Sequence, residues 1–240
     1  MTQSPIVEIL PDKAALIERS LDVVMQKLTL ALTEREIATI ALSGGSTPKP
    51  LYEGLADQSL PWDKLHVFWG DERYVAPEHP DSNEGMARHV WLDRISIPPE
   101  NIHATPTHLS DPTAAATQYE AEIRRVFATE APAVPAFDVI LLGMGDDAHT
   151  ASLFPHTPAL SVSDRLVTVG NKAGQPRITF TVPLINQARC VLFLVAGENK
   201  QPALAQVFAS EADAMSYPSR LIQPQGELRW LLDQAAGANL

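Results

Sequence analysis

The sequence predicts an α/β protein built on a doubly wound, mostly parallel sheet with helices on both faces. Short apolar runs, typical of strands buried on both faces, alternate with amphipathic stretches along the chain. Several of these runs end in residues with charged or hydroxyl side chains, as expected where the strands of such a sheet end. No repeat, low-complexity stretch or long linker divides the chain. We therefore expect a single α/β domain that spans residues 1–240.

The first elements are expected to be a helix, a strand and a second helix. Between Asp12 and Thr33 apolar residues recur every three or four positions, which indicates an amphipathic helix. A short apolar strand follows from Ile37 to Leu42. Because proline is favoured at the first position of a helix, Pro48 to Ala56 is predicted to be helical, with Thr47 as its cap.

A glycine-rich turn joins that strand to the second helix, and it consists of Ser43, Gly44, Gly45, Ser46 and Thr47. Free N–H groups, hydroxyls and the positive end of the helix dipole converge at such a turn, which makes it a candidate anion site. No Gly-Lys-Ser or Gly-Lys-Thr follows the glycines, so the turn does not match a nucleotide-binding P-loop. An ordinary capped turn without a ligand is the alternative.

Two further strands are predicted to end in charged residues. The run Leu65 to Trp69 leads into Asp71 and Arg73, which fit a solvated turn as well as a site. The run Cys190 to Ala196 leads into Lys200 and a helix. Each strand end thus delivers charge to the same region of the predicted sheet.

Two more helices are predicted from their caps. Asp81 and Glu84 have the spacing of a capping box ahead of a helix from Gly85 to Arg94. Asp111 precedes a proline and is expected to cap a helix that ends near Ala128.

The stretch from residue 137 to residue 155 is the centre of the predicted fold. The apolar run Val139 to Leu142 predicts a strand buried on both faces, and Gly143 to Gly145 forms a turn after it. The polar loop that follows carries Asp147 and His149, and Thr150 to Phe154 is expected to form a helical turn. Ligands of open α/β sheets bind beyond the carboxyl ends of the strands, so this loop is a candidate site.

Two less specific interpretations also fit this loop. Gly143, Gly145 and Ala148 fit the dinucleotide-binding pattern in its Gly/Ala form, but two adjacent carboxylates occupy the place where a pyrophosphate needs bare N–H groups. In the other interpretation, Asp147 and His149 are a loop hydrogen-bond pair without a catalytic role.

The remaining strands complete the sheet. Leu166 to Val169 and Ile178 to Val182 are predicted strands, separated by a polar loop that ends in Arg177. Ser219 to Ile222 and Leu228 to Leu232 are expected to be closing strands. Right-handed crossovers bring the ends of alternate strands to one edge. The glycine-rich turn, the charged strand ends and the Asp147–His149 loop are therefore expected to share one cleft.

Composition excludes several classes of partner. The net charge is −11 and no Lys/Arg cluster exists, which argues against nucleic acid and anionic membranes. Cys190 is the single cysteine, so no disulfide forms within the chain, and its apolar run suggests a buried bystander. Met1 to Leu10 has no basic segment ahead of an apolar one, and no apolar run approaches the length of a membrane helix. We expect a cytoplasmic protein.

Five motifs occur in the order found in 6-phosphogluconolactonases, and the chain resembles this family over about residues 38 to 205. The motifs are Ser43-Gly-Gly-Ser-Thr-Pro48, Asp71-Glu-Arg73 with Ser82-Asn83, Leu142-Gly-Met-Gly-x-Asp-x-His-Thr-Ala-Ser-Leu-Phe-Pro155, Arg177-Ile-Thr and Gly197-x-x-Lys200.

The resemblance implies a Rossmann-like fold related to that of glucosamine-6-phosphate deaminase. It implies hydrolysis of 6-phosphogluconolactone to 6-phosphogluconate in the oxidative pentose phosphate pathway, without a cofactor or a catalytic metal. The implied partner is a small phosphorylated sugar lactone, bound by a monomer or a small homo-oligomer. Members of the family usually have Gly where this chain has Ala148 and His156. Gly at the first of these positions suggests a positive φ there.

The chemistry of lactone opening assigns roles to the candidate residues. Water must become nucleophilic, and a neutral imidazole, with an unperturbed pKa of about 6.5, is suited to accept its proton. We assign His149 as the general base, while Asp147 either holds the ring's tautomer or orients the water or a sugar hydroxyl. Arg73 or loop N–H groups are expected to stabilise the oxyanion, and Asp71 is a further catalytic candidate.

The phosphate is expected to rest on Ser43 to Thr47, with Lys200 and Arg177 as counter-charges and Asn83 as a further binding residue. A zinc site is not expected, because His149 lacks a second His at helical spacing and Cys190 lies in a strand.

Two other functions stay open. A deaminase or isomerase of the related type shares the anion turn and a loop His, but the resemblance implies Ile-Ala-Phe-Asn-Glu after that His, where this chain has Thr150 to Phe154. A non-catalytic sugar-phosphate sensor would keep the anion turn and would not need His149.

Overall fold

The computed structural model describes residues 4–240, and its centre is a six-stranded sheet in which all neighbouring strands are parallel. The strand order is β1, β9, β8, β5, β2, β3. The bounds are β1 Ile6–Leu10, β2 Ala38–Leu42, β3 Leu65–Trp69, β5 Val139–Leu142, β8 Cys190–Val195 and β9 Glu227–Asp233. The predicted doubly wound α/β architecture is confirmed. Residues 1–3, the start of the N-terminal segment interpreted above, lie outside the described residues.

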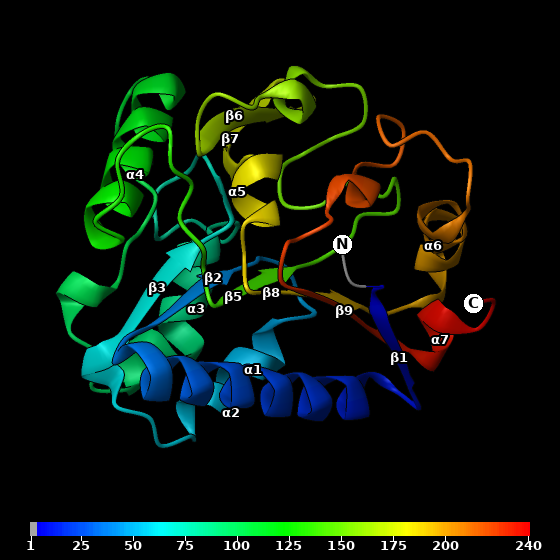
Figure 1. Ribbon diagram of the computed structural model, residues 1–240, viewed down its shortest axis with the longest axis horizontal. Helices are drawn as coiled ribbons and strands as arrows, with labels where there is room; N and C mark the ends of the chain where they lie inside the picture. The colour runs from blue at the N-terminus through cyan, green and yellow to red at the C-terminus, as the bar shows by residue number, and fades with distance from the viewer. Residues whose placement is uncertain (1–3) are drawn as a thin grey trace.

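Helices cover both faces of this sheet (Figure 1). One face is covered by α1 Lys13–Arg35, α2 Lys49–Ala56 and α3 Asn83–Val90, and the other by α4 Pro112–Val126, α5 Val182–Asn186 and α6 Gln201–Phe208. The short α7 Gln234–Gly237 follows β9 directly. Among residues 4–240, none of the helices combines the length and the apolar character needed to cross a membrane.

The central strands are buried on both faces, as their uniform apolar sequences predict. In β5, Val139 and Leu141 join the core beneath α1 and α2, whereas Ile140 and Leu142 join the core beneath α4 and α5. Neighbouring side chains on a strand point to opposite faces, so one short strand contributes to two cores.

A second sheet departs from the prediction. It has three antiparallel strands in the order β4 Asp71–Arg73, β7 Gln175–Phe180, β6 Val167–Lys172. The sequence predicted a turn or charged strand end at Asp71 to Arg73, but the chain stays extended because β7 pairs with it. The N–H of Phe180 also donates to the carbonyl of Gly70, 2.8 Å away, which ties the new strand to the end of β3.

Two predicted elements are wrong. Thr150 to Phe154 is a reverse turn instead of a helical turn, because Ala151 has a φ of 47° and the N–H of Leu153 donates to Thr150. Ser219 to Ile222 is not a strand. Residues Pro218–Leu221 form a 3₁₀ helix, and the N–H of Ser219 donates to Ala148 instead of to a neighbouring strand.

The caps were predicted in part. Asp111 caps α4 through its side chain, as predicted, and Asp12 caps α1 in the same way, which was not predicted. The cap of α3 is Ser82 instead of Asp81, because its hydroxyl accepts the N–H of Gly85. Thr47 does not cap α2, which begins at Lys49 after Pro48 and has no side-chain cap.

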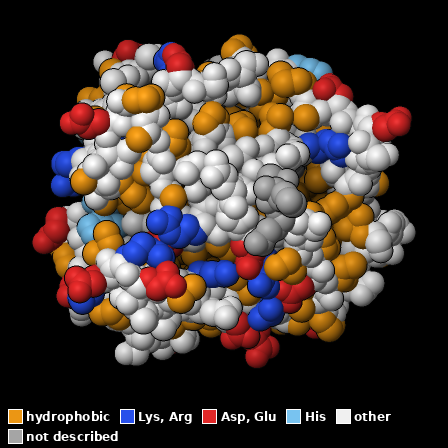
Figure 2. Space-filling view, viewed as in Figure 1, with side chains coloured by type: hydrophobic (Ala, Val, Ile, Leu, Met, Phe, Trp, Pro, Cys, Tyr) orange, Lys and Arg blue, Asp and Glu red, His pale blue; other side chains and the backbone are white. Residues whose placement is uncertain are grey.

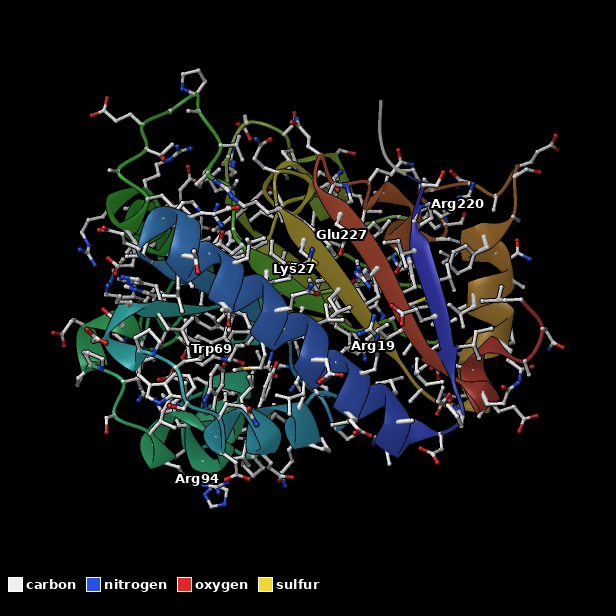
Figure 3. All side chains as sticks on the ribbon, turned by 60° about the horizontal axis from the view of Figure 1, so that its bottom comes forward. Arg19, Lys27, Trp69, Arg94, Arg220 and Glu227 are labelled. Atoms are coloured by element: carbon white, nitrogen blue, oxygen red, sulfur yellow. The ribbon has the colours of Figure 1, made fainter. Side chains whose placement is uncertain are left out.

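Helix α1 is fastened to the edge of the sheet by ion pairs (Figure 3). Lys27 Nζ lies 3.2 Å from a carboxylate oxygen of Glu227 on β9, and Arg19 Nε lies 2.7 Å from Glu8 on β1. On the face shown in Figure 2, Lys and Arg side chains lie beside Asp and Glu side chains and form no continuous basic surface, which fits the net charge of −11.

Candidate active site

A cleft of about 260 Å³ opens at the carboxyl edge of the six-stranded sheet. All the predicted site residues except Asp147 and Asn83 line it. The lining residues are Ser43, Gly44, Gly45, Ser46, Thr47, Pro48, Asp71, Arg73, Gly143, Met144, Gly145, His149, Ala151, Arg177, Leu194, Val195, Ala196 and Lys200.

The strand register explains why these segments meet. Leu42 of β2 lies opposite Trp69 of β3, and Leu142 of β5 lies opposite Phe193 of β8. Parallel strands in this register end at one level, so the residues that follow them emerge side by side. The predicted convergence of distant motifs is confirmed.

His149 is held by Asp147, two residues before it. Its Nδ1 hydrogen-bonds the Asp147 carboxylate, and its backbone N–H donates to the same oxygen at 3.1 Å. Burial raises the pKa of Asp147, but the hydrogen bonds from His149 outweigh it and leave the pKa below its usual value. The carboxylate therefore accepts the Nδ1 proton, which in the neutral ring leaves Nε2 as the free acceptor. Within residues 4–240, Nε2 has no hydrogen-bond partner.

The imidazole lies between a glycine and a phenylalanine. A Cβ at Gly145 would lie 2.0 Å from His149 Nδ1, so the ring occupies space that any other residue would fill. The Phe154 ring lies 4.5 Å from the imidazole, centroid to centroid. Both residues stand in the motif, but the sequence did not show that they contact the ring.

The backbone of this loop lies in the left-handed region at Ala148 and His156, with φ values of 59° and 56°. These are the two positions where the resemblance noted glycine, and the expected positive φ of Ala148 is confirmed. The carbonyl of Ala148 accepts two hydrogen bonds from Ser219, from its N–H at 2.9 Å and its hydroxyl at 2.8 Å. The segment near Ser219, which is not the predicted strand, thus supports the loop that carries His149.

The glycine-rich turn, residues 43–47, is called the anion turn from here on. Within residues 4–240, the N–H groups of Gly44, Gly45, Ser46 and Thr47 donate to no acceptor. The hydroxyl of Ser43 is buried and also has no partner there. The start of the turn is fixed, because the Tyr52 hydroxyl accepts the Ser43 N–H and donates to the Ser43 carbonyl. The Lys13 ammonium also donates to the Ser46 carbonyl, 3.4 Å away. Gly45 and Ser46 are exposed, so their N–H groups are open to solvent or to a ligand. A buried hydroxyl such as that of Ser43 is normally satisfied, so this unpartnered group indicates a site for a ligand.

Two arginines lie directly opposite each other in the second sheet. Arg73 of β4 pairs with Arg177 of β7, and both line the cleft. Like charges at such positions repel and destabilise the pair of strands. Burial, followed by the charge of Arg73, lowers the pKa of Arg177. The Nε of Arg73 is buried without a partner within residues 4–240, and its Nη1 donates only to the neutral carbonyl of Asp81. An anion between these side chains would relieve the repulsion.

Buried polar residues support this side of the cleft. The Ser152 hydroxyl donates to Asp71 at 2.7 Å, which links the His149 loop to β4. Glu72 accepts the N–H groups of Arg73, Asn83 and Glu84, while burial raises its pKa to about 7. Asn83 does not reach the cleft. A Cβ at Gly44 would lie 1.8 Å from its amide oxygen, so Asn83 packs behind the anion turn.

Lys200 already has a carboxylate partner. Its ammonium contacts Asp146, which also accepts a hydrogen bond from Asn199 at 2.9 Å. Sequence reasoning did not pair these residues, because they lie far apart in the chain. Among residues 4–240, no three His, Cys, Asp or Glu side chains converge so that they could hold a metal ion.

Comparisons with known proteins agree with the geometry. The family model described as "Glucosamine-6-phosphate isomerases/6-phosphogluconolactonase" matches residues 11–230. A 6-phosphogluconolactonase from Nostoc sp. is 66% identical over 98% of both chains. The structure of 6-phosphogluconolactonase from Trypanosoma cruzi has a TM-score of 0.89 at 30% identity and covers 100% of this chain and 98% of its own.

A solved monomeric glucosamine-6-phosphate deaminase shares the fold, with a TM-score of 0.81 at 17% identity. The match covers 97% of this chain and 99% of the deaminase chain. At that identity the likeness concerns the fold alone. The family match and the whole-length relatives go further, and together they show that the chain belongs to the family of glucosamine-6-phosphate isomerases and 6-phosphogluconolactonases.

Proposed function

We propose that this cleft hydrolyses 6-phospho-D-glucono-1,5-lactone to 6-phospho-D-gluconate, with His149 as the general base. The Nostoc relative is named for this activity and matches nearly the whole chain. One observation carries the mechanism: an imidazole with a free Nε2 lines the same cleft as a turn of unpartnered N–H donors. The first can activate water and the second can anchor a phosphate.

The reaction follows from these positions. His149 Nε2 takes a proton from water, and the water oxygen bonds to the lactone carbonyl carbon. Negative charge develops on the carbonyl oxygen, where Arg73 or the loop N–H groups stabilise it. The bond from that carbon to the ring oxygen then breaks, and the ring oxygen takes the proton back from the imidazolium. The resulting carboxylic acid releases a proton to solvent.

The phosphate end of the substrate is assigned to the anion turn, with Arg177 and Lys200 as counter-charges. Asn83 supports that turn in this proposal instead of contacting the substrate, because it is buried behind Gly44. Asp71 lines the cleft, and the hydrogen bond from the Ser152 hydroxyl orients its carboxylate. The cytoplasmic location and the oligomeric state stay predictions.

A direct assay tests the proposal. Hydrolysis of the phosphorylated lactone is followed by base uptake at constant pH, and the spontaneous rate is subtracted. Gluconolactone without the phosphate serves as the second substrate. We expect a much lower kcat/KM for it, because binding energy from the remote phosphate positions the reacting carbonyl. Deamination of glucosamine 6-phosphate without lactone hydrolysis would favour the related deaminase activity instead.

A further inference from the structure

The cations of the cleft are not equivalent. Within residues 4–240, Arg73 and Arg177 have no carboxylate within ion-pair distance, whereas Lys200 is paired with Asp146. The Lys200 side chain is 19% exposed and lines the cleft, and that of Asp146 is 65% exposed and does not line it. The Asp146 carboxylate thus holds the ammonium from the solvent side.

We propose that Asp146 is an internal competitor for Lys200, which the substrate phosphate must displace and which returns when the product leaves. This inference rests on the proposed role of Lys200 as a phosphate ligand. An ammonium can give short, charge-assisted bonds to a phosphate or to a carboxylate, and both use the same N–H donors. Asp146 is followed directly by Asp147 in the His149 loop, so the exchange occurs beside the reacting end of the cleft.

The strength of the pair suits an exchange. Exposed ion pairs contribute little, commonly about 0–1 kcal/mol, which corresponds to a factor of up to about 5 in binding. The hydrogen bond from Lys200 lowers the pKa of Asp146, so its carboxylate is charged at neutral pH. Asp146 therefore weakens anion binding modestly and does not block the site. The product gains a second anionic group, so the returning carboxylate also favours its release by repulsion.

The test is Asp146→Asn, measured with inorganic phosphate and 6-phosphogluconate as competitive inhibitors. Asparagine keeps the shape and can still accept the Asn199 bond, but it removes the charge. We expect both inhibition constants to fall about 2- to 5-fold at low salt, with a smaller change near 0.5 M salt. Glu198→Gln is the matched control, because Glu198 is exposed, lies in the same turn as Lys200 and has no ion pair with it. Its inhibition constants should change less than about 2-fold.

A double-mutant cycle separates this inference from the proposed function. Lys200→Ala alone tests whether Lys200 binds the phosphate at all. In the Lys200→Ala background, Asp146→Asn should have no effect, because the competitor has lost the group for which it competes. If Lys200→Ala weakens phosphate binding but Asp146→Asn behaves like Glu198→Gln, the inference is wrong and the phosphate site stands. Equal tightening with and without Lys200 would also overturn it, since the effect would then be one of net charge.

Discussion

The two loops that meet in the cleft are built in opposite ways. The His149 loop, residues 143–155, is bonded within itself and to its surroundings: the N–H of Gly145 donates to His149, the hydroxyl of Thr150 to Gly143, and the hydroxyl of Ser152 to Asp71. The anion turn leaves the N–H groups of residues 44–47 and the Ser43 hydroxyl without partners among the described residues. Several internal hydrogen bonds hold the His149 loop in place, whereas the anion turn is bonded mainly at its start.

This difference separates two tasks of the proposed enzyme. A general base must hold one geometry before the substrate arrives, because misplacement of the reacting groups lowers the rate steeply. A binding turn must offer donors that the protein has not already used, since a ligand gains little from groups that are satisfied elsewhere. Changes in the His149 loop should therefore appear in kcat, and changes around the anion turn should appear in phosphate affinity.

The largest effect is expected from a substitution that changes the proposed catalytic group and leaves the phosphate-binding groups unchanged. His149→Ala removes the proposed base but leaves the anion turn intact, so kcat should fall by about 10²- to 10⁴-fold. The inhibition constant of inorganic phosphate should stay close to that of the wild type. Steady-state kinetics, corrected for spontaneous hydrolysis, measure both quantities.

The control for this change is His108→Ala, which removes an exposed imidazole that does not line the cleft. It should leave kcat unchanged. Wild-type kcat in His149→Ala would show that the base lies elsewhere, and Asp71, an acidic residue that lines the cleft, would become the first candidate.

The sequence could predict this cleft but not its supports. The strand ends at Leu42 and Leu142 carry clear signals, because apolar runs meet glycine or polar residues there. Ser152, Asp146 and the backbone bonds of Ser219 have no local signal, because each acts on a residue brought near by the fold. Tertiary pairing with β7 likewise made a strand of a charged segment that reads locally as a turn.

A smaller effect on kcat/KM is expected when a proposed phosphate-binding residue is replaced. Lys200→Ala removes a charge-assisted bond worth about 1.5–3 kcal/mol, so kcat/KM for the phosphorylated lactone should fall roughly 10- to 100-fold. Turnover of unphosphorylated gluconolactone should hardly change. The Asp146 pair places the expected loss toward the lower end of this range, because the substrate must displace that carboxylate to gain the bond.

Lys49→Ala is the matched control for that experiment. Lys49 is exposed at the start of α2, just beyond the anion turn, and it does not line the cleft. Lys49→Ala removes the same charge near the same site, so any fall in its kcat/KM measures the general loss of electrostatic attraction. Equal losses on both lactones in Lys200→Ala would remove the phosphate from its assigned place and leave a general lactonase.

The smallest effect is a change in thermal stability, and it tests whether the His149 loop is held in one geometry before the ligand binds. Ala148 and Ala173 both have positive φ, at 59° and 52°, but Ala148 is fully buried and Ala173 is exposed in the β6–β7 turn. Replacement by Gly relieves about 1–2 kcal/mol of backbone strain at either site. It costs about 0.4–1 kcal/mol through the freer unfolded chain. At Ala148 it also costs about 0.8 kcal/mol for the lost burial of the methyl group.

These terms predict different outcomes for the two substitutions. Ala173→Gly should stabilise the protein by roughly 0.5–1 kcal/mol, which raises the Tm by about 1–3 °C for a chain of this size. Ala148→Gly should leave the Tm within about 1 °C, because relief of strain and loss of burial nearly cancel. Differential scanning calorimetry of both variants measures the pair under one set of conditions. A rise for Ala148→Gly as large as that for Ala173→Gly would mean that the methyl group adds nothing and that this loop carries net strain. A fall of several degrees would mean that the loop is packed around Ala148, so that glycine loosens the backbone on which His149 stands.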